Sequence, residues 1–217
     1  MPTVWFIRHG ESTSNAGEIA FDRGSTVLTA LGTEQAQGAS LKVTQRPDLI
    51  VVTPYIRTHL TAAPTQARYP GVPCETWPLQ EYSALAEEKY IGRTWMYRRP
   101  DMLALWERND PHYVDGAGAE SFSAFVGRIQ EALNRLAARP EKFIVVFAHG
   151  YIIQTMRLML GKPGLSLEEL MRSVPFYTQH SPIENCAVIR VEMDARGTRL
   201  HEEDFKGLEA GHAFQGD

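Results

Sequence analysis

The chain has 217 residues, of which 43% are hydrophobic and 22% are charged, and its formal net charge is −4 at pH 7. These proportions are near the average for globular proteins and argue against a disordered or fibrous chain, and the length suits one domain over residues 1–217 better than two. The chain has no long block of lysine or arginine and no long apolar window, so we expect no nucleic-acid partner, no membrane association and a cytoplasmic location.

Five segments have the composition of strands. Two of them, Leu49 to Val52 and Phe143 to Phe147, are continuous apolar runs, which is typical of strands covered on both faces in a mostly parallel sheet. The other three are Thr3 to Ile7, Pro73 to Trp77 and Ala187 to Met193. A hairpin that turns at residues 195–197 should add an antiparallel edge strand after the last of them.

Helices are expected to cover both faces of this sheet. Thr29 is placed to cap a helix that continues to about Val43. Thr53 and Pro54 suit the cap and first turn of the next helix, which Pro64 should end or kink. Together with the strands, these helices predict an α/β fold with three layers, α/β/α, around a mostly parallel central sheet.

The clearest helical periodicity lies between Phe122 and Leu136, where apolar residues recur at three- and four-residue spacing. Another helix is expected from Tyr151 to Leu160, with Gly161 as its C-cap. The segment from about 81 to 118 is instead rich in charged, aromatic and turn residues. We interpret it as an inserted excursion that covers the edge of the sheet where ligands bind, rather than as a separate domain.

Charged residues follow three of the predicted strands. Arg8 and His9 follow the first strand, Arg57 lies just after the second, and His149 ends the strand near residue 145. Ligands of open parallel sheets bind at the carboxyl ends of the strands, so these side chains should meet at one edge. Gly10 and Gly150 leave out side-chain bulk next to His9 and His149, so that a ligand can approach the backbone. The N-terminus of the helix that follows favours a bound anion. A histidine at a strand end is more often structural, but packing gives no reason to gather cations, so the set indicates a phosphate site.

Four motifs of the chain, in order, resemble those of the histidine phosphatase superfamily, also called the phosphoglycerate mutase-like family. They are RHGESTSN at 8–15, LTALGTEQA at 28–36, TPYIRTHLTA at 53–62 and AHG at 148–150. The resemblance implies a phosphoglycerate mutase-like fold and a phosphatase of the histidine acid phosphatase type.

In that family a histidine is phosphorylated during the reaction, and the resemblance assigns this role to His9. It also implies that Arg8, Arg57 and His149 bind the phosphoryl oxygens, and that Asn15 and Gly150 belong to the substrate site. Fixed cations can neutralise a transferring phosphoryl group as Mg²⁺ does elsewhere, so we expect no metal and no cofactor.

The leaving oxygen needs a proton, and family members commonly supply it from a glutamate after the third strand. The sequence offers Glu81 at that place, and we assign it as the general acid, provided that its pKa is raised. Glu120 is the main alternative, while Glu87 and Glu88 read more naturally as a solvated pair.

Two segments depart from the phosphoglycerate mutases. The residues after Glu81 read Tyr-Ser-Ala-Leu in place of Arg-His-Tyr-Gly, and Ser25 to Thr29 replace the usual Asp-x-Pro-Leu-Thr. Both favour a phosphatase that hydrolyses a phosphomonoester; a mutase, or a catalytically silent module that binds a phosphorylated ligand, is the alternative. The expected partner is a small phosphorylated molecule, with a phosphoprotein as the alternative, and no feature indicates an oligomeric state.

The excursion also holds residues that could contact such a substrate. Basic residues could reach an acidic substrate, and aromatic residues could form an apolar wall, although capping the sheet is the more ordinary role for any one of them. The basic residues are Lys89, Arg93, Arg98 and Arg99, and the aromatic ones are Trp95, Tyr97 and Trp106.

Overall fold

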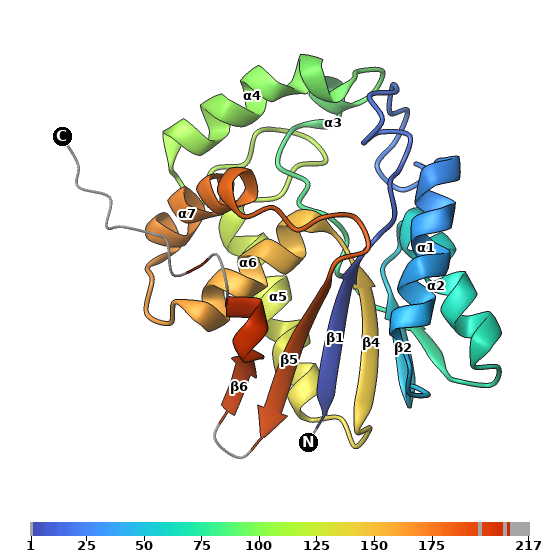
Figure 1. Cartoon of the computed structure of the whole chain (residues 1–217). Coiled ribbons are helices and arrows are strands. Elements are labelled where there is room, and N and C mark those ends of the chain that lie inside the picture. Colours follow the sequence, from blue (N-terminus) through green and yellow to red (C-terminus); the bar gives the residue numbers. More distant parts are fainter. Residues whose placement is uncertain (1, 195–196, 206–207, 209–217) are drawn as a thin grey trace.

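The computed structural model describes residues 2–194, 197–205 and 208, which contain a six-stranded sheet in the order β3-β2-β4-β1-β5-β6 (Figure 1). The strands are β1 (Thr3–Arg8), β2 (Leu49–Val52), β3 (Cys74–Thr76), β4 (Phe143–Ala148), β5 (Val188–Asp194) and β6 (Gly197–Leu200). The first four are mutually parallel, whereas β5 is antiparallel to β1 and β6 is antiparallel to β5. The predicted α/β class and antiparallel edge are confirmed, while residues 195–196 of the predicted turn lie outside the described part.

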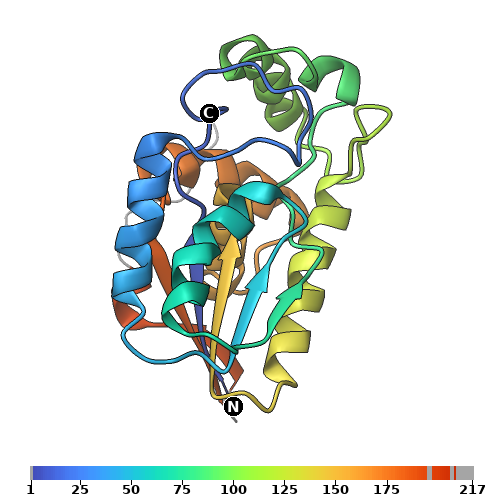
Figure 2. The ribbon, with the colours of Figure 1, turned by 90° about the vertical axis from the view of Figure 1, so that its right-hand side faces the viewer.

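Helices cover both faces of this sheet (Figures 1 and 2). The helices are α1 (Ala30–Lys42), α2 (Ile56–Arg68), α3 (Glu87–Tyr90), α4 (Trp95–Arg108), α5 (Phe122–Ala137), α6 (Gly150–Gly161) and α7 (Leu167–His180), and a 3₁₀ turn spans Glu202–Phe205. Helices α1 and α2 cover one face, α5 and α6 cover the other, and α7 packs on α6. Helices α3 and α4, which belong to the excursion at 81–118, lie beyond the carboxyl ends of the parallel strands.

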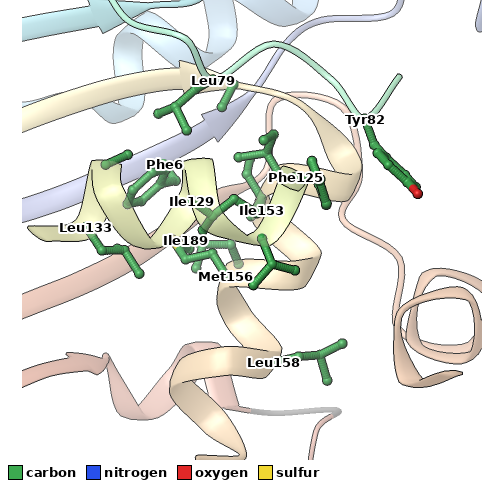
Figure 3. Close-up of a cluster of buried hydrophobic side chains, with 14 of the residues drawn as sticks. Phe6, Leu79, Tyr82, Phe125, Ile129, Leu133, Ile153, Met156, Leu158 and Ile189 are labelled. Carbon is green, nitrogen blue, oxygen red and sulfur yellow. The ribbon is translucent and has the colours of Figure 1, made fainter. Parts of the chain in front are cut away.

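The two faces of the sheet hold separate apolar clusters because neighbouring strand residues point in opposite directions. In β2, Leu49 and Val51 pack with α5 and α6, whereas Ile50 and Val52 pack toward α1 and α2. All four are at most 1% exposed, as their continuous apolar run predicts. Figure 3 shows the larger cluster, in which strand residues meet α5 and α6 through Phe6, Ile189, Ile129, Leu133, Ile153 and Met156.

Helix ends agree with the sequence in one case and differ in two others. Thr29 caps α1 as predicted, since its side chain accepts a hydrogen bond from the backbone of Gly32. The prediction for α2 was wrong, because the helix begins at Ile56 and the hydroxyl of Thr53 is used elsewhere. Gly161 is the last helical residue of α6 rather than its cap.

Three prolines lie inside helices. Pro64 lies inside α2, which continues to Arg68, so of the two predicted outcomes for this proline, an end or a kink of the helix, the end was wrong. Pro100 and Pro175 lie inside α4 and α7, two helices that the sequence analysis did not predict. A signal for α7 was present, because Ser166 and Glu169 form a reciprocal capping box.

No helix in the described part of the chain is long and apolar enough to cross a membrane. The cytoplasmic location and the single domain over the whole chain stay predictions.

Candidate active site

The register of the central strands places the two predicted histidines beside each other. Arg8 pairs with Ala148 in the parallel ladder of β1 and β4, so the residue after each one, His9 or His149, leaves the sheet at the same level. The backbone N–H of His9 donates to the carbonyl of Ala148 at 3.0 Å, and the two imidazole centroids are 5.3 Å apart. The histidines that directly follow these two buried strands are therefore neighbours in space.

A cavity of about 150 Å³ lies at this edge of the sheet. Five of the seven predicted site residues line it, namely Arg8, His9, Asn15, Arg57 and Glu81. An adjoining chamber of about 450 Å³ shares three of these residues and adds the sixth, Gly150. His149 lines neither space; it is fully buried, and its ring lies next to that of His9.

The ring of His9 is held in a form that suits a nucleophile. Its Nδ1 lies 2.7 Å from the carbonyl oxygen of Gly10, which can only accept, so Nδ1 carries the proton and the lone pair is on Nε2. Burial, followed by the charges on Arg57 and Arg8, holds the pKa of His9 well below its usual value. The imidazole is therefore neutral at pH 7 and its Nε2 can attack an electrophile.

His149 is anchored from behind by a threonine. Its Nε2 lies 2.8 Å from Oγ1 of Thr53, while its Nδ1 is buried without a hydrogen-bond partner. Oγ1 of Thr53 also accepts from the backbone of Tyr55 at 3.3 Å, and the hydroxyl of Thr58 donates to the carbonyl of Tyr55 at 2.8 Å. Oγ1 of Thr53 therefore occupies Nε2 of His149, and no described residue hydrogen-bonds to its Nδ1.

The two predicted arginines are fixed by backbone carbonyls. Nη1 of Arg8 donates to the carbonyl of Ile183 at 2.6 Å, and Nη1 of Arg57 donates to the carbonyl of Arg23 at 2.9 Å. Nε of Arg8 is buried without a partner. The side chain of Asn185 donates to the carbonyl of His9 at 2.8 Å and steadies the end of β1 from the other side. These contacts hold both guanidinium groups at the cavity with donors to spare.

Glu81 lies at the N-terminus of α6. Its Oε2 accepts from the backbone of Tyr151 at 3.1 Å, and its Oε1 accepts from the backbone of Tyr82 at 3.0 Å. Burial raises the pKa of Glu81, and it outweighs these two hydrogen bonds and the charges on Arg57 and Arg8, which act in the opposite direction. Protein burial thus already provides the raised pKa that a general acid needs.

The competing glutamates are placed differently. Glu120 forms a bidentate pair with Arg128, at 2.7 and 3.0 Å, and accepts from the backbone of Ser83. Glu87 and Glu88 are exposed on α3. None of the three lines the cavity or the adjoining chamber.

Glycine is needed for packing at only one of the two positions that follow the histidines. A Cβ on Gly10 would lie 2.4 Å from the carbonyl oxygen of Gly32, so Gly10 lets α1 approach the end of β1. This packing requirement differs from the ligand clearance that the sequence analysis gave for it. A Cβ on Gly150 would meet only ordinary contacts, the nearest 3.6 Å away at Arg8.

The sequence analysis missed part of the cavity wall. Arg23, from the loop between β1 and α1, lines the cavity together with Tyr90 and Arg98. From the sequence, Arg98 was one of several candidate basic residues of the excursion, and Arg23 had no expected role. The sequence of this loop indicates only turns. Arg23 reaches the site because tertiary contacts, such as the β-bridge between Ser12 and Leu28, fold the loop back toward the cavity.

The other residues considered in the excursion lie away from the cavity, apart from Trp95, which lines both spaces. Lys89 is paired with Asp115 at 2.6 Å, Trp106 is buried in the core, and Arg93, Tyr97 and Arg99 are exposed outside both spaces. Among the described residues, no group of three or more histidine, cysteine, aspartate or glutamate side chains is placed to hold a metal ion.

Comparison with known proteins agrees with this geometry. The family model of the histidine phosphatase superfamily, branch 1, matches residues 4–204. The search of curated proteins found no match.

Three solved structures illustrate the similarity of the fold. Alpha-ribazole phosphatase from Shigella flexneri has a TM-score of 0.70 at 20% identity, covering 92% of this chain and 94% of that chain. The mycobacterial glucosyl-3-phosphoglycerate phosphatase, in a complex with VO3, has a TM-score of 0.70 at 24% identity, covering 93% and 98%. A histidine-to-alanine variant of phosphoserine phosphatase from Entamoeba histolytica, in complex with phosphoserine, has a TM-score of 0.71 at 19% identity, covering 96% and 100%.

Proposed function

The chain belongs to the histidine phosphatase superfamily, branch 1, and we propose that it is a phosphatase that hydrolyses a small phosphomonoester through a phosphohistidine on His9. The observation that carries this proposal is the state of His9, a neutral imidazole protonated on Nδ1 by its bond to Gly10. Its free Nε2 belongs to a cavity that also presents Arg8, Arg57 and Glu81. A nucleophile, fixed cations and an acid with a raised pKa are the parts that phosphoryl transfer needs.

In the first step, Nε2 of His9 attacks phosphorus and the bond to the leaving oxygen breaks. Glu81, in its protonated form, gives its proton to that oxygen, so the products are an alcohol and a phosphohistidine. Arg8 and Arg57 neutralise the equatorial oxygens, and the unpartnered Nδ1 of His149 is assigned to one of them. No step needs a metal, because guanidinium groups already supply the positive charge.

In the second step, Glu81 is a carboxylate and acts as the base. It takes a proton from water, whose oxygen attacks phosphorus, and the bond between phosphorus and Nε2 breaks. Orthophosphate leaves, and His9 and Glu81 return to their starting protonation states. Asn15 and Gly150 border the space for the alcohol portion of the substrate. The cavity and the adjoining chamber together have a volume that suits a small molecule better than a protein loop.

Phosphate release from p-nitrophenyl phosphate and from an alkyl phosphate tests the proposal, with and without 2,3-bisphosphoglycerate and 3-phosphoglycerate. We expect release to water that does not depend on 2,3-bisphosphoglycerate, and an acid-labile, base-stable phosphoenzyme after rapid quench. Isomerisation of 3-phosphoglycerate without net phosphate release would instead identify a mutase. Binding of these ligands without turnover would identify a silent phospho-ligand module.

A further inference from the structure

The cavity carries more positive charge than a phosphoryl group needs. Four guanidinium groups line it, from Arg8, Arg23, Arg57 and Arg98, against the single carboxylate of Glu81. Four positive charges and one negative charge leave a net charge of +3 while Glu81 is ionised, and the net charge is +4 when Glu81 is protonated for the first step. A phosphomonoester brings about −1.5 to −2 at pH 7, so at least one positive charge stays uncompensated when only a phosphoryl group is bound.

The excess comes from Arg23 and Arg98, which form a pair of their own. The guanidinium carbon of Arg23 lies 4.2 Å from the ring centre of Tyr90, and that of Arg98 lies 4.1 Å from the same ring centre. They come from different parts of the chain, the loop before α1 and the first turn of α4. Two cations thus meet at one aromatic ring on the cavity wall.

Neither arginine is neutralised by the protein. The ion pairs of residues 2–194, 197–205 and 208 include neither of them. Arg23 donates to the carbonyl of Leu85 and leaves its buried Nε without a partner. Arg98 is only 5% exposed, and it donates to the carbonyl of Thr94 at 3.3 Å and to the hydroxyl of Ser14 at 3.2 Å. All of these acceptors are neutral.

A purely structural role does not explain this arrangement. Stacking on Tyr90 and bonding to carbonyls could hold one arginine in place, but a second unpaired cation beside it adds repulsion and desolvation. The usual solution for buried charge is an opposite charge within hydrogen-bond distance, and no side chain provides it here. An anionic group of a ligand has room to bind there, because Arg98 lines both the cavity and the adjoining chamber of about 450 Å³.

We propose that Arg23 and Arg98 form a second anion subsite, and that the substrate is a small phosphomonoester whose alcohol portion carries a second anionic group. That group is a carboxylate or a second phosphate. Both groups present a pair of negatively charged oxygens that a guanidinium group can bind with two hydrogen bonds. The inference rests on the proposed phosphatase function for its reaction. It adds the chemical class of the substrate and assigns a role to Arg23.

Three substrates of one chain length test the subsite: propyl phosphate, 3-(phosphonooxy)propanoate and propane-1,3-diol bisphosphate. In the wild-type protein we expect one of the two compounds with a second anionic group to have a higher kcat/KM than propyl phosphate. The expected difference is roughly 10- to 100-fold, as hydrogen bonds to charged groups allow. The better of the two identifies the second group. A ratio near one for both compounds would overturn the subsite while leaving the phosphatase function intact.

Variants then assign the preference to the two arginines. Arg23→Gln and Arg98→Gln should each lower that ratio by about tenfold or more, and Arg23→Lys should retain part of it because the charge remains. Arg99→Gln is the matched control, since its exposed side chain on the same helix lines neither space, and it should leave the ratio unchanged. A wild-type preference that survives both Gln variants would show that another group recognises the anion.

A binding measurement separates this inference from the reaction. Calorimetric titration of the His9→Ala protein with the same three compounds needs no turnover. We expect the preferred compound with a second anionic group to bind at least about tenfold more tightly than propyl phosphate. Arg23→Gln should remove this difference in affinity. Equal affinities would reject the subsite whether or not the protein is a phosphatase.

Discussion

The carboxylate of Glu81 caps the N-terminus of α6 through the backbone N–H of Tyr151, at 3.1 Å. This is the place where the sequence analysis expected the helix N-terminus to favour a bound phosphate. A protonated Glu81 leaves that N–H less well satisfied, so the helix N-terminus opposes protonation while burial favours it. The balance lies on the side of burial, since the pKa of Glu81 is raised.

The opposite shifts of two side chains predict the pH profile. The pKa of His9 is depressed, so its nucleophilic form persists as pH falls through 6.5 and is lost only well below that value. The pKa of Glu81 is raised, so its acid form is present below that raised value and is lost as pH rises through it. We therefore expect kcat/KM for an alkyl phosphate to be greatest between the depressed pKa of His9 and the raised pKa of Glu81.

The comparison that checks this profile is wild type against Glu81→Gln with the same alkyl phosphate from about pH 4 to pH 9. The ionisation of the substrate itself, near pH 6, affects both proteins equally and cancels in their ratio. The ratio of wild type to variant should fall as pH rises. A ratio that stays constant over the whole range would show that Glu81 does not titrate in the reaction.

Replacing the nucleophile should stop the reaction without unfolding the protein. His9→Ala is expected to lower turnover by more than about hundredfold and to abolish the phosphoenzyme, because no other group in the cavity has a free imidazole lone pair. His9 is only 4% exposed, so a modest loss of thermal stability should accompany the change. The exposed His112 gives the control His112→Ala, and circular dichroism checks the fold. Turnover above about 1% of wild type would contradict a phosphohistidine on His9.

Metal removal should not change the activity. We propose that Arg8 and Arg57 supply the positive charge at the phosphoryl group, so dialysis against excess EDTA is expected to leave kcat and KM unaltered. The measurement compares chelated protein with the same sample after Mg²⁺, Mn²⁺ or Zn²⁺ is returned. Activity that disappears with EDTA and returns with one metal would refute the role given to the arginines.

The two glycines of the histidine motifs should respond differently to alanine. Gly10→Ala places a methyl group 2.4 Å from the carbonyl oxygen of Gly32, and relief requires backbone movement, so we expect a loss of about 1–3 kcal/mol in the free energy of unfolding. Gly150→Ala meets contacts of 3.6 Å or more and should change stability little. Denaturant unfolding of both variants checks the difference. Equal losses would show that the end of β1 tolerates the methyl group.

The sequence predicted the elements whose signal is local. The runs around residues 50 and 145 are buried strands, and Thr29 caps its helix as its position indicated. The strand ends were then enough to bring His9 and His149 together, since parallel strands end at one edge. That inference needed only the order and type of the elements.

Signals that depend on tertiary packing were missed or misread. Pro64 and Pro100 suggest helix ends, yet α2 and α4 continue past them because burial of one helix face outweighs one lost backbone hydrogen bond. Arg23 lies in a loop without periodicity, and only its fold-back places it at the cavity. The proposal of Glu81 over Glu120 as the acid also draws on the structure, because Glu120 has a partner, Arg128, that no local pattern reveals.

The last prediction concerns how Glu81 acts on the leaving oxygen. A general acid matters only when that oxygen needs a proton, so p-nitrophenolate can leave unaided whereas an alkoxide cannot. Glu81→Gln should slow phosphoenzyme formation far more for an alkyl phosphate than for p-nitrophenyl phosphate, by roughly the 10² to 10⁴ that a positioned acid contributes. Rapid-quench measurement of the phosphoenzyme is required, because loss of the base in the second step would hide the difference at steady state. Glu120→Gln serves as the control, since its partner is Arg128 outside the cavity, and it should slow both substrates alike. Equal slowing of the two substrates by Glu81→Gln, or a larger difference for Glu120→Gln, would assign the proton to another carboxylate.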